Sequence, residues 1–160
     1  ARFPFLAANL LDESTGRPVD WPNVRPSVLV DAAGLKVGLI GVMTAGALRA
    51  TLPLNVRGLR MAPLADAPTP GAAGGAPRMP AELRDFRDPH NTASCDATAE
   101  IFEVARQLPA GLVQAIAAGH THDGLAHVVN GVAIVQAYWG GRAFGRLDLV
   151  VDRDRGEVVD

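Results

Sequence analysis

Apolar runs separated by turn residues are the feature that most constrains what this chain can fold into. Leu35 to Val42 is apolar nearly throughout, and such a run predicts a strand buried on both faces of a sheet. Leu112 to Ala118 predicts a second buried strand. Of the 160 residues, 48% are hydrophobic. The chain can therefore bury one sizeable core, and one domain over residues 1–160 is expected.

Cap and stop residues predict a helix in the second half of the chain. Asp96 is a suitable N-cap, and apolar side chains then recur at helical spacing on one face. Pro109 and Gly111 end the helix after about Leu108. The face is formed by Ile101, Val104, Ala105 and Leu108.

Further strand-like segments complete the pattern. Ser27 to Val30 is joined to the run beginning at Leu35 by a hairpin-like link. Asn130-Gly131 predicts a turn before a strand near Val132 to Ala137, and another strand is expected near Phe144 to Val151. Strands that alternate with helices, followed by hairpin-like strands, predict an α/β layered sheet.

Residues 65 to 89 differ from the rest of the chain. Ala67 to Pro77 is rich in Pro, Gly and Ala, has no hydrophobic periodicity and cannot bury a face. It predicts a flexible loop or linker. Because a loop of this length is unusual inside a compact domain, we expect an atypical insert or replacement at about 65–90.

Composition excludes several classes of partner. The formal net charge of −2 indicates neither nucleic acid nor an anionic membrane, and no apolar run reaches membrane-spanning length. Cys95 is the only cysteine, which excludes an internal disulfide and a cysteine-based zinc cluster. It has no basic neighbour in sequence and is expected to be inert. No signal peptide is expected, because Ala1 leads directly into strand-like sequence.

Gly119-His120-Thr121-His122 is the clearest candidate for chemistry. It follows a predicted buried strand, and catalytic groups of α/β sheets commonly lie at the carboxyl ends of strands. In an extended segment residues i and i+2 point the same way, so the two imidazoles can converge on one site. In a loop they can diverge and serve adjacent ions. Imidazole binds zinc, manganese or iron.

The neighbouring residues have supporting roles in this interpretation. Gly119 lets the backbone turn and approach a metal or substrate, whereas Thr121 and Asp123 can orient the imidazole rings. The alternative interpretation is that His-x-His arises by chance, since two histidines do not complete a catalytic metal site.

Several ordered motifs make the chain resemble calcineurin-like metallophosphoesterases of the 5′-nucleotidase branch. The tetrapeptide is similar to the last motif of that family, and three flanking segments are similar to strands of the branch. These segments are Phe3 to Leu10, Leu35 to Thr44, and Val132 to Ala137 followed by Gly140 to Leu147.

The resemblance implies a fold, a chemistry and a substrate class. The fold would be part of a layered α/β sandwich, the C-terminal part of the catalytic domain. His120 and His122 would each bind one ion of a two-metal site that hydrolyses phosphate monoesters such as nucleotides. The divalent ions would be zinc, manganese or iron. A periplasmic or extracellular location is compatible with the resemblance.

The sequence also departs from the family pattern. The other ligand motifs would lie upstream of residue 1, and a histidine that normally ends a strand between Thr44 and Asp96 is missing. His90 is more readily a solvated loop residue than its replacement, and His127 is expected on a strand surface. The segment at 65–90 would then reflect a deletion or a local frameshift. Tyr138-Trp139 is expected to pack under the following glycine-rich turn, with stacking on a base or lining a pocket as the alternatives.

Three functional hypotheses follow from these departures. The first is a fragment of a metal-dependent phosphoesterase that is inactive alone. The second is a non-catalytic remnant or interaction module that self-associates through an exposed sheet edge. The third is a product that needs a partner chain to supply the upstream motifs.

Overall fold

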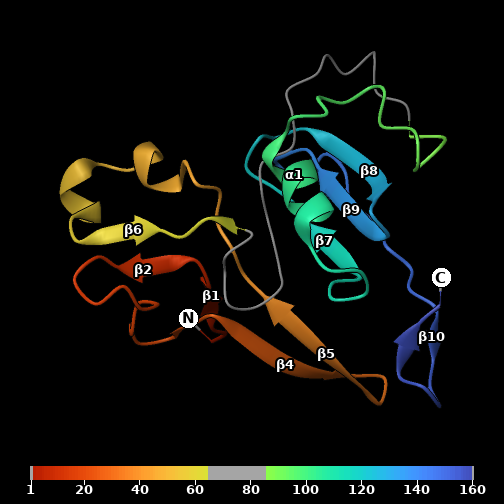
Figure 1. The fold of residues 1–160 in the computed structure, drawn as a ribbon, viewed down its shortest axis with the longest axis horizontal. Helices are drawn as coiled ribbons and strands as arrows, with labels where there is room; N and C mark the ends of the chain where they lie inside the picture. Colours follow the sequence, from red (N-terminus) through yellow and green to blue (C-terminus); the bar gives the residue numbers. More distant parts are fainter. Residues whose placement is uncertain (1, 65–85, 160) are drawn as a thin grey trace.

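The computed structural model describes residues 2–64 and 86–159. Of the atypical segment expected at 65–90, residues 65–85 therefore lie outside the described residues. Figure 1 shows the described chain as a group of short strands and turns from the N-terminal part, a long hairpin, and a helix on a small sheet from the C-terminal part. None of the described helices is long and apolar enough to cross a membrane.

The C-terminal part is a two-layer α/β unit. Helix α1 (Glu100–Gln107) lies against a three-stranded sheet of order β7-β9-β8, formed by β7 (Ala115–Ala117), β9 (Val132–Ala137) and β8 (Gly124–Val129). β7 pairs with β9 in parallel, and β8 pairs with β9 antiparallel. The α/β class predicted from the sequence is confirmed.

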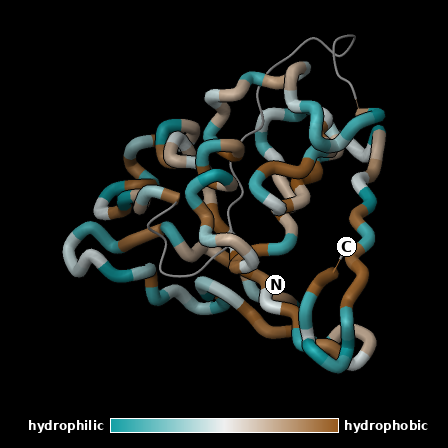
Figure 2. Tube along the Cα trace, turned by 45° about the vertical axis from the view of Figure 1, so that its right-hand side comes forward, coloured by the Kyte–Doolittle hydropathy of each residue, from teal (hydrophilic) through white to brown (hydrophobic). Residues whose placement is uncertain are grey.

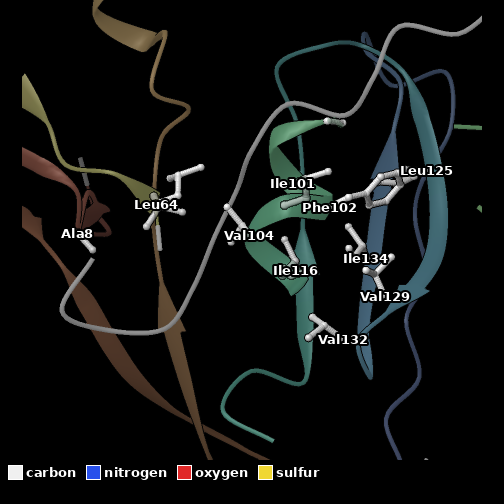
Figure 3. Packing of buried hydrophobic residues seen from close by; sticks show 13 residues of the cluster. Ala8, Leu64, Ile101, Phe102, Val104, Ile116, Leu125, Val129, Val132 and Ile134 are labelled. Atoms are coloured by element: carbon white, nitrogen blue, oxygen red, sulfur yellow. The ribbon is translucent and has the colours of Figure 1, made fainter. Parts of the chain in front are cut away.

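The main core lies between α1 and this sheet. Ile101 and Phe102 of α1 and Ile134 of β9 are fully buried, and Figure 3 shows them packed with side chains from β7 and β8. The same cluster continues to Ala8 and Leu64 of the N-terminal part. The predicted apolar helix face is correct, and burial of that face holds α1 on the sheet.

The helix begins later than predicted. Its N-cap is Ala99, not Asp96. The Asp96 carboxylate instead accepts hydrogen bonds from the hydroxyl and backbone N–H of Thr98, at 2.7 and 2.9 Å, and closes a turn before the helix. The Thr98 hydroxyl is the main cause that lowers the pKa of Asp96. Asp side chains form such local turns readily, and here the turn replaces the cap.

The N-terminal part consists of two-stranded pairings. β1 (Phe5–Leu6) pairs in parallel with β3 (Val24–Arg25), and β2 (Leu10–Asp12) pairs antiparallel with β6 (Leu59–Met61). Two short 3₁₀ helices, η1 (Ala47–Ala50) and η2 (Pro53–Val56), precede β6. A second, smaller cluster includes Ala7, Leu10 and Val19 and lies under these elements.

The predicted hairpin forms, but its burial differs from the prediction. β4 (Ser27–Ala32) and β5 (Leu35–Ile40) pair antiparallel across a turn at Ala33-Gly34. The expectation of a strand buried on both faces is wrong, since Val37 and Leu39 are 37% and 44% exposed. The reason is that β5 pairs, among the described strands, only with β4. An apolar run specifies which surface can be buried, and a covering layer decides whether it is.

The last predicted strand does not form. Residues 143–150 run without strand pairing, and only Val151–Asp152 (β10) pairs with Glu157–Val158 (β11). A Cβ added at Gly145 would lie 3.5 Å from Val135 Cβ and 3.9 Å from Ala137 Cβ. These side chains share one face of β9, so this part of the segment lies against the face of the sheet and not beside a strand edge. Phe144 consequently remains 87% exposed. Figure 2 shows hydrophobic stretches where the chain runs toward its C-terminus.

Candidate functional site

The candidate tetrapeptide lies in the loop between β7 and β8, after the C-terminal end of β7 as predicted. The Ala118 backbone N–H donates to the Val135 carbonyl of β9 at 2.8 Å, which anchors the start of the loop. At its other end the Asp123 carbonyl accepts from the Tyr138 backbone N–H at 2.9 Å. Residues 118–123 are therefore held against β9 at both ends.

The two histidines have an unusual backbone. His120 has φ 76° and His122 has φ 62°, both in the left-handed region. Between them the Thr121 N–H donates to the Gly119 carbonyl at 3.0 Å and tightens the turn. The extended geometry considered from the spacing is thus not the one adopted, so the loop alternative applies. Non-glycine residues in this region cost roughly 1–3 kcal/mol each and cluster at functional sites.

Both imidazoles are exposed, and one of them is stacked on an indole. The His122 and Trp139 rings lie 5.7 Å apart between centroids with planes 24° apart. The Arg142 guanidinium carbon is 4.4 Å from the centroid of the same indole. Trp139 is 48% exposed. It therefore lines the histidine loop and is not packed under the glycine-rich turn.

Tyr138 packs differently from Trp139. Its ring lies against Gly124, where an added Cβ would meet Tyr138 Cζ at 2.6 Å. Gly124 is thus the residue that admits the tyrosine ring beside the start of β8. Tyr138 itself has φ 54°, so a third residue near the loop is left-handed.

Gln136 is a site residue that the sequence prediction missed. It is 6% exposed on β9, and its side-chain Nε2 donates to Thr121 Oγ1 and to the Asp123 carbonyl, both at 2.9 Å. A signal was present in the sequence. Val132, Ile134 and Gln136 share one face of a strand, and a polar residue in that buried register needs a partner.

The two remaining histidines, His90 and His127, do not lie in the histidine loop. His90 is exposed in a turn, where its backbone N–H donates to the Asp88 carboxylate at 2.9 Å. His127 is not a strand-surface residue as predicted. It is 2% exposed, its ring lies 6.5 Å from that of Phe102, and its Nδ1 lies 3.3 Å from the Pro89 carbonyl oxygen. β8 turns it inward, so it is a core residue.

The described residues do not complete a metal site by themselves. Within residues 2–64 and 86–159, no group of three or more His, Cys, Asp or Glu side chains is arranged to hold a metal ion. Asp123 is buried, at 7% exposure, while His120 and His122 are exposed. A catalytic metal needs at least three protein ligands in the usual sites, so the donor set here is partial.

An open hollow of about 840 Å³ lies elsewhere in the molecule. It is bordered by β5, by the chain before β7 and by the C-terminal hairpin, and it includes His90 but neither His120 nor His122. Its ionisable side chains are Lys36, His90 and Glu157. We regard it as the gap beside the β5 edge and not as a catalytic pocket, because its lining is mainly aliphatic side chains and glycine.

The fold, with a helix on a small sheet, is shared with a known structure. A crystal structure of a candidate 5′-nucleotidase from Staphylococcus aureus, solved in complex with α-ketoglutarate, superposes with a TM-score of 0.58. The match has 16% sequence identity and covers 97% of this chain and 31% of that one. The fold is therefore that of part of this protein.

Sequence comparison points to the same class. The chain is 26% identical to a 5′-nucleotidase of Vibrio cholerae over 180 residues, covering 92% of the chain and 30% of that protein. It is also 26% identical to endonuclease YhcR of Bacillus subtilis over 161 residues, covering 98% of the chain and 13% of that protein. No family model matches. The chain is 5′-nucleotidase-like in sequence and fold, which confirms the predicted resemblance, and it spans less than a third of these relatives.

Proposed function

We propose that this chain forms part of a metal-dependent phosphoesterase of the 5′-nucleotidase type and supplies two ligands to its metal site. His120 and His122 are the ligands, one for each of two divalent ions, with zinc, manganese or iron as the candidate metals. The observation that carries the proposal is a pair of exposed imidazoles on a constrained loop at a strand end, in a 5′-nucleotidase-like fold. The substrate class is a phosphate monoester, with nucleotides favoured by the name of the Vibrio cholerae relative.

The residues of the loop have distinct roles in this proposal. Bound divalent ions would clamp the phosphate and activate a water molecule. His120 and His122 would hold the ions through their ring nitrogens. Gly119 leaves room for close approach, because an added Cβ would meet nothing within 4 Å there. Thr121 and Asp123 maintain the loop geometry from its centre and its end.

The proposed site is incomplete in the described residues, so the chain alone should not hydrolyse phosphate esters. The other ligands would come from a further part of the polypeptide or from a partner chain. Two imidazoles alone do not supply the carboxylate that a two-metal site needs to hold both ions in place. The same proposal treats residues 1–160 as part of one metallophosphoesterase domain, with 65–90 as an atypical segment.

Two measurements test this proposal. Titration of the chain with Zn²⁺ in a calorimeter should detect weak binding that falls at least tenfold in His120→Ala and in His122→Ala, because each removes half of the donor set. His90→Ala, which changes an exposed histidine outside the loop, is the matched control. Equal binding by the wild type and both loop variants would refute the ligand assignment.

Turnover is the second measurement. With Mn²⁺ added, the isolated chain should not hydrolyse p-nitrophenyl phosphate above background. Robust turnover that disappears in His120→Ala would show that the chain is a complete catalyst and that the fragment proposal is wrong.

A second candidate function is an interaction module, and the β4–β5 hairpin favours it. Leu29 is 72% exposed on one face of the hairpin, while Val37 and Leu39 are exposed on the other. An apolar edge strand of this kind is a template for pairing with another chain. The occupant we propose is a second copy of this chain, joined through β5.

A further inference from the structure

The side chain of Gln136 is a buried amide whose orientation is determined by its partners. Its Nε2 lies 2.9 Å from Thr121 Oγ1 and 2.9 Å from the Asp123 carbonyl oxygen. A backbone carbonyl can only accept a hydrogen bond, so the NH₂ group must face Asp123 and the amide cannot be flipped. One N–H is thus committed to each partner.

The two partners of Gln136 are the residues on either side of His122. Thr121 precedes it and Asp123 follows it. The Asp123 carbonyl also accepts from the backbone N–H of Tyr138, the residue after β9. Two donors, one in β9 and one just after it, therefore hold this end of the loop. His122 keeps its left-handed φ of 62° between these two attachments, and its ring lies on Trp139.

A polar side chain at this position is costly unless its donors are needed. Gln136 lies in register with the apolar Val132 and Ile134 on the buried face of β9. Its Oε1 is buried and has no hydrogen-bond partner among the described residues. A buried acceptor of this kind destabilises by roughly 1–3 kcal/mol, which a methionine or leucine would avoid. The amide therefore contributes through the two hydrogen bonds that its NH₂ group donates to the loop.

We propose that Gln136 is a positioning residue for the histidine loop. By bonding both neighbours of His122 it maintains the left-handed backbone that directs the imidazole onto Trp139 and toward the proposed metal site. Burial strengthens both bonds, because no water competes for them. The metal-binding part of this inference depends on the proposed function, whereas the part that concerns ring position does not.

The test uses the ring position of His122 as a spectroscopic signature. Stacking on Trp139 should shift the His122 ring protons upfield in the ¹H NMR spectrum, and the Trp139→Leu variant gives the unstacked reference. With four histidines in the chain, assignment by single substitution is practical. Gln136→Met keeps the side-chain shape without donors, and Gln136→Glu places acceptors where donors are needed.

The expected result is the same for both Gln136 variants. The His122 ring protons should move to their positions in Trp139→Leu, and Zn²⁺ affinity should fall about tenfold, as is typical when a partner that orients a ligand is removed. Gln114→Met is the matched control, since Gln114 is an exposed glutamine that donates to the Gly111 carbonyl outside the loop. It should leave both readouts unchanged.

A second pair of variants keeps the inference testable where Gln136 variants fail to fold. Thr121→Val removes one acceptor and should reduce the upfield shift of the His122 ring protons. Thr121→Ser retains the hydroxyl and should preserve that shift. An unchanged shift in folded Gln136→Met, or in Thr121→Val, would overturn the positioning role. A wild-type chain that does not bind Zn²⁺ would instead overturn the proposed function, while the metal-free shift would still decide the role of Gln136.

Discussion

At the scale of single residues, the histidine loop combines strain with exposure. The turns at Ala33-Gly34 and Asn130-Gly131 also use left-handed residues, but there asparagine, alanine and glycine occupy hairpin turns. His120 and His122 carry larger side chains in the same backbone region and remain open to solvent. Such strain persists only where the surroundings over-determine it, and β9 supplies those surroundings.

The strain at His120 predicts a stability gain from glycine. His120→Gly should raise the free energy of unfolding by about 1 kcal/mol, because glycine adopts positive φ without a Cβ clash. Urea denaturation followed by circular dichroism measures this gain. The same variant should bind Zn²⁺ less well, so stability and ligand capacity would change in opposite directions.

Thr121→Gly is the control for that prediction. Thr121 keeps a negative φ between the two histidines, so glycine there relieves no strain. It adds entropy to the unfolded chain and removes the hydroxyl that accepts from Gln136, and both effects should destabilise. A loss of stability in His120→Gly as large as in Thr121→Gly would show that the left-handed backbone of His120 is not strained.

The sequence predicted that the two histidines follow the strand that forms β7, but it did not predict their spatial neighbours. Imidazoles after an apolar run indicate a site from residue type and order alone. The contacts of His122 with Trp139 and of Thr121 with Gln136 join positions 15 to 17 residues apart. They depend on how β9 returns beside β7, so only the fold could reveal them.

At the scale of elements, α1 connects the two parts of the molecule through its first turn. Glu100 accepts a hydrogen bond from the Thr44 hydroxyl at 2.6 Å and from the Ala45 N–H at 3.0 Å. These partners follow β5, more than fifty residues earlier in the chain. A carboxylate at a helix N-terminus is also favoured by the helix dipole.

Glu100→Ala should therefore lower the free energy of unfolding by about 2 kcal/mol, the loss expected for hydrogen bonds to a charged group. Glu100→Gln should retain part of that energy because its amide can still bond Thr44. Thermal and urea unfolding measure both effects. Glu103→Ala is the control, since Glu103 is an exposed acidic residue in the same first turn. If Glu100→Ala and Glu103→Ala lower the free energy of unfolding by similar amounts, the effect comes from the helix dipole and not from the hydrogen bonds to Thr44 and Ala45.

At the scale of the whole molecule, the described part of the chain leaves apolar strand surface uncovered. The core under α1 is well packed, but the β4–β5 hairpin and the segment at 143–150 contribute exposed large hydrophobic side chains. Figure 1 shows the hairpin continuing from the N-terminal strands and lying apart from α1 and its sheet. A chain with these surfaces is expected to find a partner for them, whether another part of a longer polypeptide or a second copy.

Self-association should consequently depend on the exposed face of β5. We expect the chain to form a dimer or larger species with increasing concentration in light-scattering chromatography. Leu39→Lys places a charge on that face and should shift the chain toward monomer. Leu52→Lys, at a 71% exposed position outside the hairpin, should leave the association unchanged. A chain that is monomeric at all concentrations would exclude the interaction module.

The sequence by itself determined the α/β class, the helix face, the hairpin, the turn at Asn130-Gly131 and the strand end that carries His120 and His122. These features depend on local spacing of apolar, turn and cap residues, which the chain carries wherever it folds. The tertiary structure alone decided that β5 is exposed, that residues 143–150 form no strand, that His127 is buried and that Gln136 holds the histidine loop. Each of these outcomes depends on which strands lie beside one another, because burial and strand pairing require a neighbour that local sequence does not specify.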